Sequence, residues 1–432
     1  MIDKIDSVVN AIGGFLYQPY IVPLFLIVAG LYFTIRTGLI QFRLFGESIH
    51  VVAEKPKEKG SISSFGALMV STASRVGTGN IVGVSTAICL GGFGAVFWMW
   101  VVALVGGASA FIESALAQVY KKRDADGSSY GGPSYYMEQA LHQRWLGIVF
   151  AVVLILTYVV GFNMLAAYNL QDAFGGFSFY VKGRTPYIIG AILAVLFAVC
   201  VLGGGKRLTN VTGVLVPVMG LLYIVMSLVV VIMNIKIFPS VIANIFRDAF
   251  NFKAAFSGFA GSCIMWGIKR GLYSNEAGMG STPHAHALAN VKNPHEQGTV
   301  AIIGVFIDMF VILTLNALVI ISTLYAGDGP LAGCGAAALS STFNKTNLAQ
   351  CAFGTVFGYK AGSMFVAICL FFFAFSTILS WNLFGKINMV YLFGKKSASV
   401  YTLLALIFIF LGTTMSNDLV WELSDMLNQL MV

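Results

Sequence analysis

Long apolar runs dominate the chain, and short polar segments separate them. A helix needs about 20 mostly apolar residues to cross a bilayer, and runs of this length without strict alternation predict helices rather than barrel strands. The sequence therefore predicts an all-α polytopic membrane protein with 11 transmembrane helices. The expected spans are residues 16–35, 65–91, 94–119, 146–170, 186–203, 211–236, 254–290, 299–326, 361–384, 399–414 and 417–432.

Polar and small residues interrupt two of these runs. Residues 74–80 read SRVGTGN, and residues 268–283 read IKRGLYSNEAGMGSTP. Backbone that leaves the helical conformation inside a bilayer is costly unless it lines a cavity walled by protein. Two such interruptions predict a binding site near the middle of the membrane.

The composition supports a membrane protein and excludes several other classes. Apolar residues make up 58% of the 432 positions and charged residues only 10%. So small a charged share does not fit a soluble enzyme or a nucleic-acid-binding module. The spans contain no HExxH, GxSxG or paired-carboxylate motif, so an enzyme is not expected. The expected partners are the lipid bilayer and a transported solute, without nucleic acid, cofactor or obligate protein partner.

Basic residues are distributed unevenly between alternate loops. If the N-terminus is outside, 15 Lys and Arg residues lie on the inner side and 8 on the outer side. Because positive loops face the cytoplasm, this pattern predicts a cell-membrane protein with its N-terminus outside and its C-terminus inside. The same orientation places Cys334 and Cys351 in one outer loop, where they could form a disulfide.

A weak internal repeat relates the two interrupted runs. Arg75 and Asn80 match Arg270 and Asn275 at an offset of 195 residues, and the same offset pairs Glu113 with Asp308. Five spans separate the two runs, so they would cross the membrane in opposite directions. This arrangement is typical of an inverted repeat of five helices plus five.

The repeat predicts how a single transporter domain, residues 1–432, is divided. Residues 16–35 would form an extra N-terminal helix. Residues 64–236 and 254–432 would form the two five-helix repeats, the last helix being apparently incomplete.

An interrupted helix presents free main-chain groups to a ligand. Its half-helix N-terminus attracts an anion, and its half-helix C-terminus offers carbonyl oxygens to a cation. A pair of such helices suits a zwitterion together with a metal cation. Side-chain oxygens that could help bind them belong to Thr78, Asn80, Ser274 and Asn275.

The two long motifs, residues 74–83 (SRVGTGNIVG) and 266–281 (WGIKRGLYSNEAGMGS), resemble signatures of the alanine or glycine:cation symporter family. The resemblance covers essentially the whole chain. Further agreement comes from Gly131–Pro133 with Tyr135 and Tyr136, from Gly161-x-Asn163-Met164, and from Ser376–Leu379. The family implies a sodium-coupled importer of small neutral amino acids, such as alanine, glycine or serine, with the LeuT-like fold.

The resemblance also implies roles for individual residues. Around the substrate it places Thr78, Gly79, Asn163, Trp266, Gly271, Tyr273 and Ser274. Around a sodium ion it places carbonyls near Ala73 and Val76 and the hydroxyls of Ser376 and Thr377. A second ion site or a gate would involve Arg75, Asn80, Asn275 and Asp308. Sodium is the co-transported ion, and no other metal is expected.

The chain departs from the family pattern at one position that bears on specificity. The family commonly has Gln a few residues after the Asn-Met pair, where this chain has Ala166. Loss of an amide there would admit a different or larger substrate side chain.

Several residues keep two interpretations at this stage. Trp266 and Tyr273 line the pocket or simply pack, and His284 and His286 are taken as structural because their spacing points them apart. Arg75 could bind the substrate, but a gate or a link between helices, made by pairing with an acid or with free carbonyls, is favoured, and Arg270 and Lys269 have the same alternatives. The acids predicted as their partners are Glu113, Glu276 and Asp308, which could alternatively carry a coupled proton. Proton-coupled amino acid transport and, less favoured, a channel remain the alternatives.

Overall fold

The computed structural model describes residues 22–54, 62–125, 127–202, 204–251, 263–333 and 343–431. Helices make up almost all of the regular structure, and a short hairpin pairs β1 (Lys122–Arg123) with β2 (Ser129–Tyr130). Cys334 lies outside the described residues, so its pairing with Cys351 stays a prediction.

The first half of the chain forms an N-terminal arm followed by the helices of the first interrupted run. The arm consists of α2 (Val22–Arg36), α3 (Ile40–Arg43) and α4 (Phe45–Ala53). After it come α5 (Ser64–Arg75), η1 (Gly79–Gly83), α6 (Val84–Gly91), α7 (Gly94–Val119), α8 (Pro133–Leu141), α9 (Arg144–Leu156), η2 (Thr157–Phe162), α10 (Asn163–Asp172), α11 (Thr185–Val201), α12 (Gly204–Met233) and α13 (Phe238–Ala249).

The second half begins with the other interrupted run. Its helices are α15 (Cys263–Asn275), α16 (Pro283–His286), α17 (Pro294–Phe306), η4 (Ile307–Leu313), α18 (Thr314–Ile320), η5 (Ile321–Tyr325), α19 (Leu348–Phe357), α20 (Tyr359–Phe393), α21 (Ser397–Gly412) and α22 (Asn417–Met431). Helices η1, η2, η4 and η5 are π-helical turns, which are frequent at functional sites.

Five helical stretches of the described chain are long and apolar enough to cross a membrane. They are Gly94–Val119, Arg144–Asp172, Arg207–Met233, Pro294–Tyr325 and Tyr359–Phe393. Several shorter apolar helices accompany them, among them Thr185–Val201 and Ser397–Gly412. The protein is thus a mostly helical polytopic membrane protein. The two interrupted runs are divided into shorter pieces and do not qualify as continuous spans.

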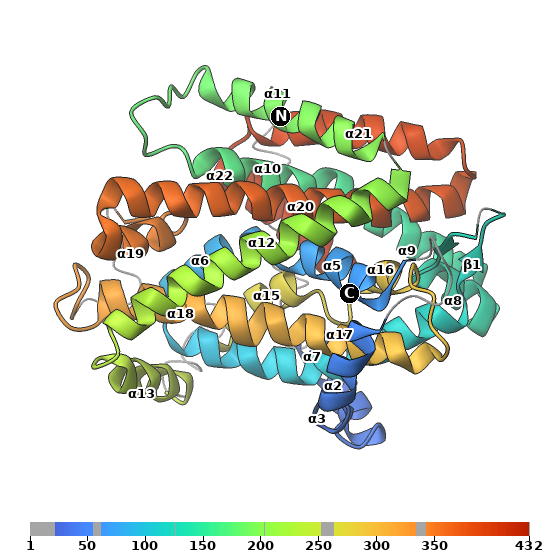
Figure 1. Ribbon diagram of the computed structural model, residues 1–432, viewed down its shortest axis with the longest axis horizontal. Coiled ribbons are helices and arrows are strands. Elements are labelled where there is room, and N and C mark those ends of the chain that lie inside the picture. Colours follow the sequence, from blue (N-terminus) through green and yellow to red (C-terminus); the bar gives the residue numbers. More distant parts are fainter. Residues whose placement is uncertain are drawn as a thin grey trace.

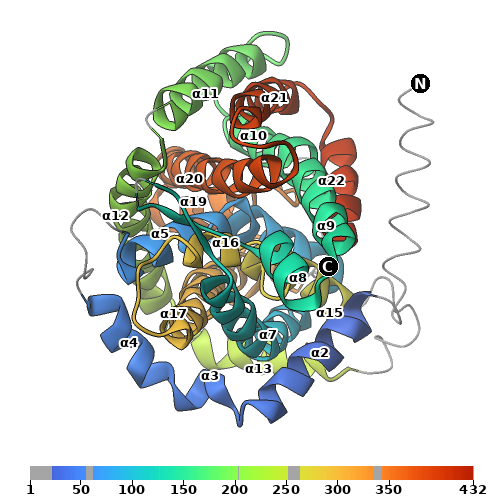
Figure 2. The same ribbon diagram turned by 90° about the vertical axis from the view of Figure 1, so that its right-hand side faces the viewer.

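The helices pack side by side, with the interrupted runs inside the bundle (Figure 1). Helix α7 packs against α15 and α17, and α5 packs against α12 and α20. In the view along the bundle, α11 and α21 lie on one side, and α2, α3 and α4 form an arc on the opposite side, outside α7 and α17 (Figure 2).

Five short helices lie in segments that the hydropathy pattern leaves as loops. They are α3, α4, α8, α13 and α19, of 4, 9, 9, 12 and 10 residues. Their length is too small for a membrane span, which is why a search for long apolar runs does not find them.

Candidate functional site

The first interruption lies between α5 and η1. Helix α5 ends at Arg75, and Val76 leaves the helical region with φ −77° and ψ 81°. A Cβ atom at Gly77 would approach the Thr377 Oγ1 atom of α20 to 2.6 Å. A Cβ atom at Gly79 would lie 3.1 Å from the Tyr273 ring. The two glycines therefore let this backbone lie directly against α20 and α15.

The second interruption lies between α15 and α16, and its position corrects the sequence prediction. Helix α15 continues without a break through residues 270–275, so the interruption is confined to residues 276–282. Glu276, Gly278 and Gly280 have φ angles of 52°, 82° and 75°. These left-handed conformations end the helix.

Arg75 joins the two interruptions. Its buried guanidinium donates to the Asn275 carbonyl at 2.8 Å, to the Thr282 hydroxyl at 2.9 Å and to the Ala301 carbonyl at 3.3 Å. The first two acceptors flank the second interruption, one at the end of α15 and one just before α16. The segments 75–80 and 275–282 are therefore in contact.

Glu276 makes a second link between the two interruptions. Its carboxylate accepts hydrogen bonds from Ser74 at 2.9 Å, from Ser281 at 2.5 Å and from the indole of Trp381 at 2.7 Å. Trp381 belongs to α20, so this one carboxylate ties both interrupted runs to a third helix.

Glu113 and Asp308 contact the interruptions from the two helices that follow them. Glu113, on α7, accepts from the amides of Gly278 at 3.2 Å and Gly280 at 3.0 Å. Asp308, on η4, accepts from Asn80 at 2.7 Å and from Ser274 at 3.3 Å. Each acid thus reaches the interruption of the other half of the chain.

Asn80 holds the first interruption in shape. Its side-chain oxygen accepts from the Gly77 amide at 3.1 Å, while its own carbonyl accepts from Asn316 at 2.7 Å. Asn316 in turn accepts from the Tyr223 hydroxyl at 2.7 Å. The motif search does not find Asn316 or Tyr223, because they lie far from the interruptions in the sequence.

The residues predicted to bind sodium meet where α5 approaches α20. The Thr377 hydroxyl lies 2.8 Å from the Ala73 carbonyl and 2.8 Å from the Phe373 carbonyl. Ser376 donates to the same Phe373 carbonyl at 3.0 Å. Val76 follows at the end of α5 and is fully buried. The Phe373 carbonyl is an oxygen of this cluster that the sequence analysis does not identify.

Tyr273, which is predicted to contact the substrate, belongs to a cluster of four aromatic rings. Phe162 lies 5.2 Å from Tyr273 and 4.8 Å from Trp381, and Trp421 lies 5.8 Å from Tyr273. Thr78, next to Gly79, is buried and close to the Tyr273 hydroxyl.

Asn163 is a buried side chain with unused hydrogen-bonding capacity. It begins α10 directly after the π-helical turn η2, and neither its side-chain oxygen nor its nitrogen has a hydrogen-bond partner. A buried amide without partners is costly, so this group is available to a polar ligand. Ala166 is fully buried one turn further along the same helix.

Gly271 and Trp266, both predicted around the substrate, make contacts between helices. Gly271 packs against Met99 of α7, whose Cα would lie 3.3 Å from an added Cβ. Trp266 packs on Gly91 and lies beneath Lys269 and Arg270, 5.1 and 5.3 Å from its ring centre.

The partner predicted for Lys269 and Arg270 is wrong. Both cations pair with Asp425 of α22, Lys269 at 2.7 Å and Arg270 through two bonds of 3.0 and 2.8 Å. Arg270 also stacks on Trp421 at 4.3 Å. Because Trp421 contacts Tyr273, this ion pair closes α22 over the candidate site.

The matched motifs of the repeat also differ in local structure. Arg75 is the last residue of α5, whereas Arg270 lies five residues before the end of α15. Asn80 lies after the first interruption, in η1, whereas Asn275 lies before the second interruption, at the end of α15. The match at an offset of 195 residues therefore does not align the two interruptions residue by residue.

The two histidines contact different partners. His284 bonds to Ser281 and Asn388, and His286 to Gln297. Among the described residues no group of three or more His, Cys, Asp or Glu side chains could hold a metal ion.

Two interrupted helices that meet inside a bundle of apolar helices define a class of protein, the polytopic membrane transporters. A solved structure has this fold, the crystal structure of MhsT in complex with L-phenylalanine. The TM-score is 0.53 at 14% identity, and the match covers 83% of this chain and 80% of that one.

The family follows from comparison with known sequences. The model of the sodium:alanine symporter family matches residues 2–432, so the chain belongs to this family. The predicted resemblance is confirmed, as are sodium-coupled amino acid symport and the expectation that the protein is not an enzyme.

Named relatives align over almost the whole chain. The amino-acid carrier protein AlsT of Bacillus subtilis is 40% identical over 424 residues, covering 98% of this chain and 86% of the relative. The sodium/alanine symporter AgcS of Methanococcus maripaludis is 37% identical, covering 98% and 91%. The probable sodium/glutamine symporter GlnT of B. subtilis is 36% identical, covering 99% and 86%.

Proposed function

We propose that this protein imports a small neutral amino acid, such as alanine, glycine or serine, together with Na⁺ by alternating access. The carrying observation is the contact between the two interruptions, in which Arg75 donates to the Asn275 carbonyl at 2.8 Å. Main-chain groups of both runs then face one site, where a zwitterion and a cation bind together.

The buried charges around Arg75 support coupling to a cation. Three carboxylates act on this one guanidinium, those of Glu276, Asp308 and Glu113. If all were ionised, the group would carry a formal charge of −2 in a medium that penalises unbalanced charge. A bound cation would offset part of this excess.

We assign the substrate carboxylate to the amides and hydroxyl at Thr78 and Gly79, with Tyr273, Ser274 and Asn163 around the rest of the molecule. Sodium would bind to the Ala73, Val76 and Phe373 carbonyls and to the hydroxyls of α20. Supporting this assignment, the two Thr377 contacts of 2.8 Å already bring carbonyl oxygens of α5 and α20 to one hydroxyl. Oxygen ligands without a thiolate or imidazole suit a hard cation.

A second ion site or a gate would form around Asp308. Asn80 and Ser274 both donate to the Asp308 carboxylate, and Arg75 donates to the carbonyl of Asn275, the residue after Ser274. Unlike the site near Thr377, this one contains a full negative charge.

We further propose an orientation and a helix count. With the N-terminus outside the cell membrane, the Gly94 end of α7 faces outward. The pair Arg270–Asp425 then closes the outer side, because Trp266 beside it packs on Gly91. Eleven spans result when each interrupted run counts as one, with residues 64–236 and 254–432 as inverted repeats. Glu113 of the first repeat contacts the second interruption, and Asp308 of the second repeat contacts Asn80 beside the first interruption, which supports this division into two repeats.

Uptake into proteoliposomes tests this function. Radiolabelled alanine, glycine and serine should enter when an inward Na⁺ gradient is present and stay outside in choline buffer. Saturable uptake that Na⁺ drives would support symport. A steady current without saturation by substrate would contradict it and indicate a channel.

Proton coupling is the second candidate, favoured by the three buried carboxylates near Arg75. It predicts equal uptake in choline buffer when an inward pH gradient replaces the Na⁺ gradient.

A further inference from the structure

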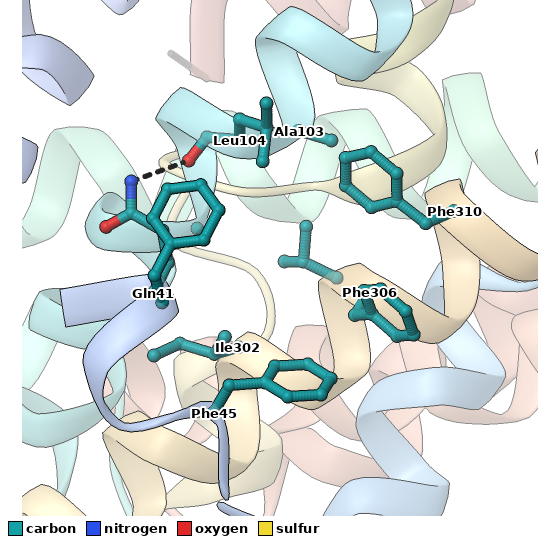
Figure 3. A pocket seen from close by; sticks show the side chains of 10 residues that line it. Gln41, Phe45, Ala103, Leu104, Ile302, Phe306 and Phe310 are labelled. Atoms are coloured by element: carbon teal, nitrogen blue, oxygen red, sulfur yellow. Dashed lines mark hydrogen bonds between the residues drawn. The ribbon is translucent and has the colours of Figure 1, made fainter. Parts of the chain in front are cut away.

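A cavity of about 390 Å³ lies between the N-terminal arm and the helix bundle. Small-molecule sites commonly range from about 300 to 1,000 Å³, so this space is large enough for a ligand. It is separate from the interruptions, and the proposed transport mechanism does not use it. Its walls come from α3, α4, α7, α17 and η4 (Figure 3).

The lining of this cavity is almost entirely apolar. Phe45, Ile302, Phe306 and Phe310 face the space, and the amide of Gln41 is the one polar side-chain group among the lining residues (Figure 3). The nitrogen of that amide is engaged, because it donates to the Leu104 carbonyl and the Thr34 hydroxyl at 3.2 Å each, and its buried oxygen is the one side-chain acceptor among the lining residues. An apolar space of this kind favours a hydrocarbon over water.

The cavity opens onto an apolar surface. Three of its lining residues are exposed, Phe42 by 60%, Phe306 by 40% and Leu104 by 37%. Large apolar side chains at the surface of a polytopic membrane protein face lipid. A hydrocarbon chain could therefore enter sideways from the bilayer.

Two cations of the arm lie close in sequence to the lining residues Gln41 and Phe42. Arg36 ends α2 and Arg43 ends α3, and both are exposed. The Arg43 guanidinium folds back over the turn, where it would lie 2.9 Å from a Cβ atom at Gly38. Guanidinium groups at this place would bind phosphate oxygens of a headgroup.

We propose that this cavity binds an acyl chain of an anionic membrane phospholipid, with the lipid phosphate held by Arg36 and Arg43. Charge and shape complement each other in this assignment, because Arg43 directly follows the lining residue Phe42 on α3. The amphiphile matches the site at both ends, whereas a free phosphate would leave the apolar space empty.

A lipid bound here would brace the arm against helices that carry the transport site. Helix α7 contributes Gly107 and Ala103 to the cavity and Glu113 to the second interruption. Asp308 lies on η4 between the lining residues Phe306 and Phe310. The lipid would thus stabilise the packing of α3 and α4 on both helices.

Photo-crosslinking of the full chain in detergent tests this proposal. The probe is phosphatidylglycerol with a diazirine in its acyl chain, compared with phosphatidylcholine carrying the same chain. We expect phosphatidylglycerol to label peptides containing residues 41–45 and 302–310. The substitution Gly107→Leu should reduce this labelling by about tenfold, because it displaces methylenes from apolar contact.

Gly107→Leu is suited to the test because a Cβ at Gly107 would meet the Gln41 Cβ at an ordinary 3.5 Å. The matched control is Gly213→Leu on α12, where a Cβ meets nothing within 4 Å. If Gly107→Leu does not fold, Ala103→Leu fills the same space. Labelling that persists in the filled variant would overturn the proposal.

The headgroup has its own test. The double variant Arg36→Gln/Arg43→Gln should remove the preference for phosphatidylglycerol, and Arg144→Gln, an exposed arginine of α9, should keep it. Equal labelling by the two lipids in the unchanged protein would overturn the assignment of an anionic lipid.

Discussion

Thr377 places a hydroxyl between main-chain carbonyls of two helices, 2.8 Å from Ala73 on α5 and 2.8 Å from Phe373 on α20. Few side chains can do this without distorting either helix, because the hydroxyl of threonine lies close to the backbone. The same position makes the oxygen a ligand in the proposed sodium site.

The substitution Thr377→Val tests this ligand. It keeps the shape of the side chain and removes one oxygen, so the Na⁺ concentration for half-maximal uptake should rise roughly 5–30-fold, equivalent to about 1–2 kcal/mol. The matched control is Thr323→Val, because the Thr323 hydroxyl donates only to the Val319 carbonyl, four residues earlier in the chain. An unchanged sodium dependence of Thr377→Val would remove this residue from the site.

Thr78→Val tests the proposed carboxylate site. The variant removes a buried hydroxyl beside Gly79, and we expect the KM for the amino acid to rise by about tenfold, because a hydrogen bond to a charged group contributes about 1.5–3 kcal/mol. The sodium dependence at saturating substrate should change less. Normal KM values would show that the substrate binds elsewhere.

Ala166→Gln tests the specificity argument. Restoring the amide that the family commonly has at this buried position should shift preference toward alanine and glycine over larger substrates. Competition of unlabelled amino acids against radiolabelled alanine measures this shift, and an unchanged order of competitors would contradict the interpretation.

Residue identities near the interruptions could be predicted because both motifs are local in sequence. Thr78, Tyr273 and Ser274 come from such motifs and lie together. Asp425 and Trp381 could not be predicted, since they reach the site from α22 and α20 across the fold. Nothing local in the sequence distinguishes Asp425 from an exposed acid.

At the scale of the element, the two interruptions have different local causes. The first depends on Gly77 and Gly79, which allow contact with α20 and α15. The second depends on positive φ angles at Glu276, Gly278 and Gly280. The sequence predicted both interruptions but extended the second into α15, because polar residues such as Ser274 and Asn275 resemble a loop although the helix continues through them.

A pair of glycine substitutions tests the first interruption. Gly77→Ala brings a Cβ to 2.6 Å from Thr377 Oγ1. It should therefore lower the free energy of unfolding by about 1–3 kcal/mol and reduce uptake. Gly83→Ala, six residues on, meets nothing within 4 Å and should preserve both. Equal behaviour of the two variants would show that close backbone approach at Gly77 is not required.

The packing of α22 over the candidate site can be tested through the ion pair between Asp425 of α22 and Arg270 of α15. Asp425→Asn removes the charged carboxylate that pairs with Lys269 and with the buried Arg270, which should cost about 3–5 kcal/mol of stability. The double variant Arg270→Gln/Asp425→Asn should recover part of this loss in a thermal unfolding cycle. The exposed pair Lys345–Asp418 is the control and should contribute less than about 1 kcal/mol. Additive effects of the two buried changes would contradict the pairing.

At the scale of the whole molecule, the hydropathy pattern predicted the bounds of several long helices within a few residues. The span expected at 94–119 coincides with Gly94–Val119, and that expected at 146–170 lies within Arg144–Asp172. The contact between the two interrupted runs is a tertiary property. Hydropathy could not predict it, and the repeat indicated only that both runs exist.

The central claim is that the two interruptions form one site for an amino acid and Na⁺. Coupled ligands raise each other's affinity by the same factor, and a bound ligand stabilises the folded protein. The most direct measurement is the thermal unfolding of the purified protein with alanine, glycine and serine, in Na⁺ and in choline. We predict that at least one amino acid raises the unfolding temperature strongly in Na⁺ and little in choline. Equal stabilisation in both buffers would contradict the account.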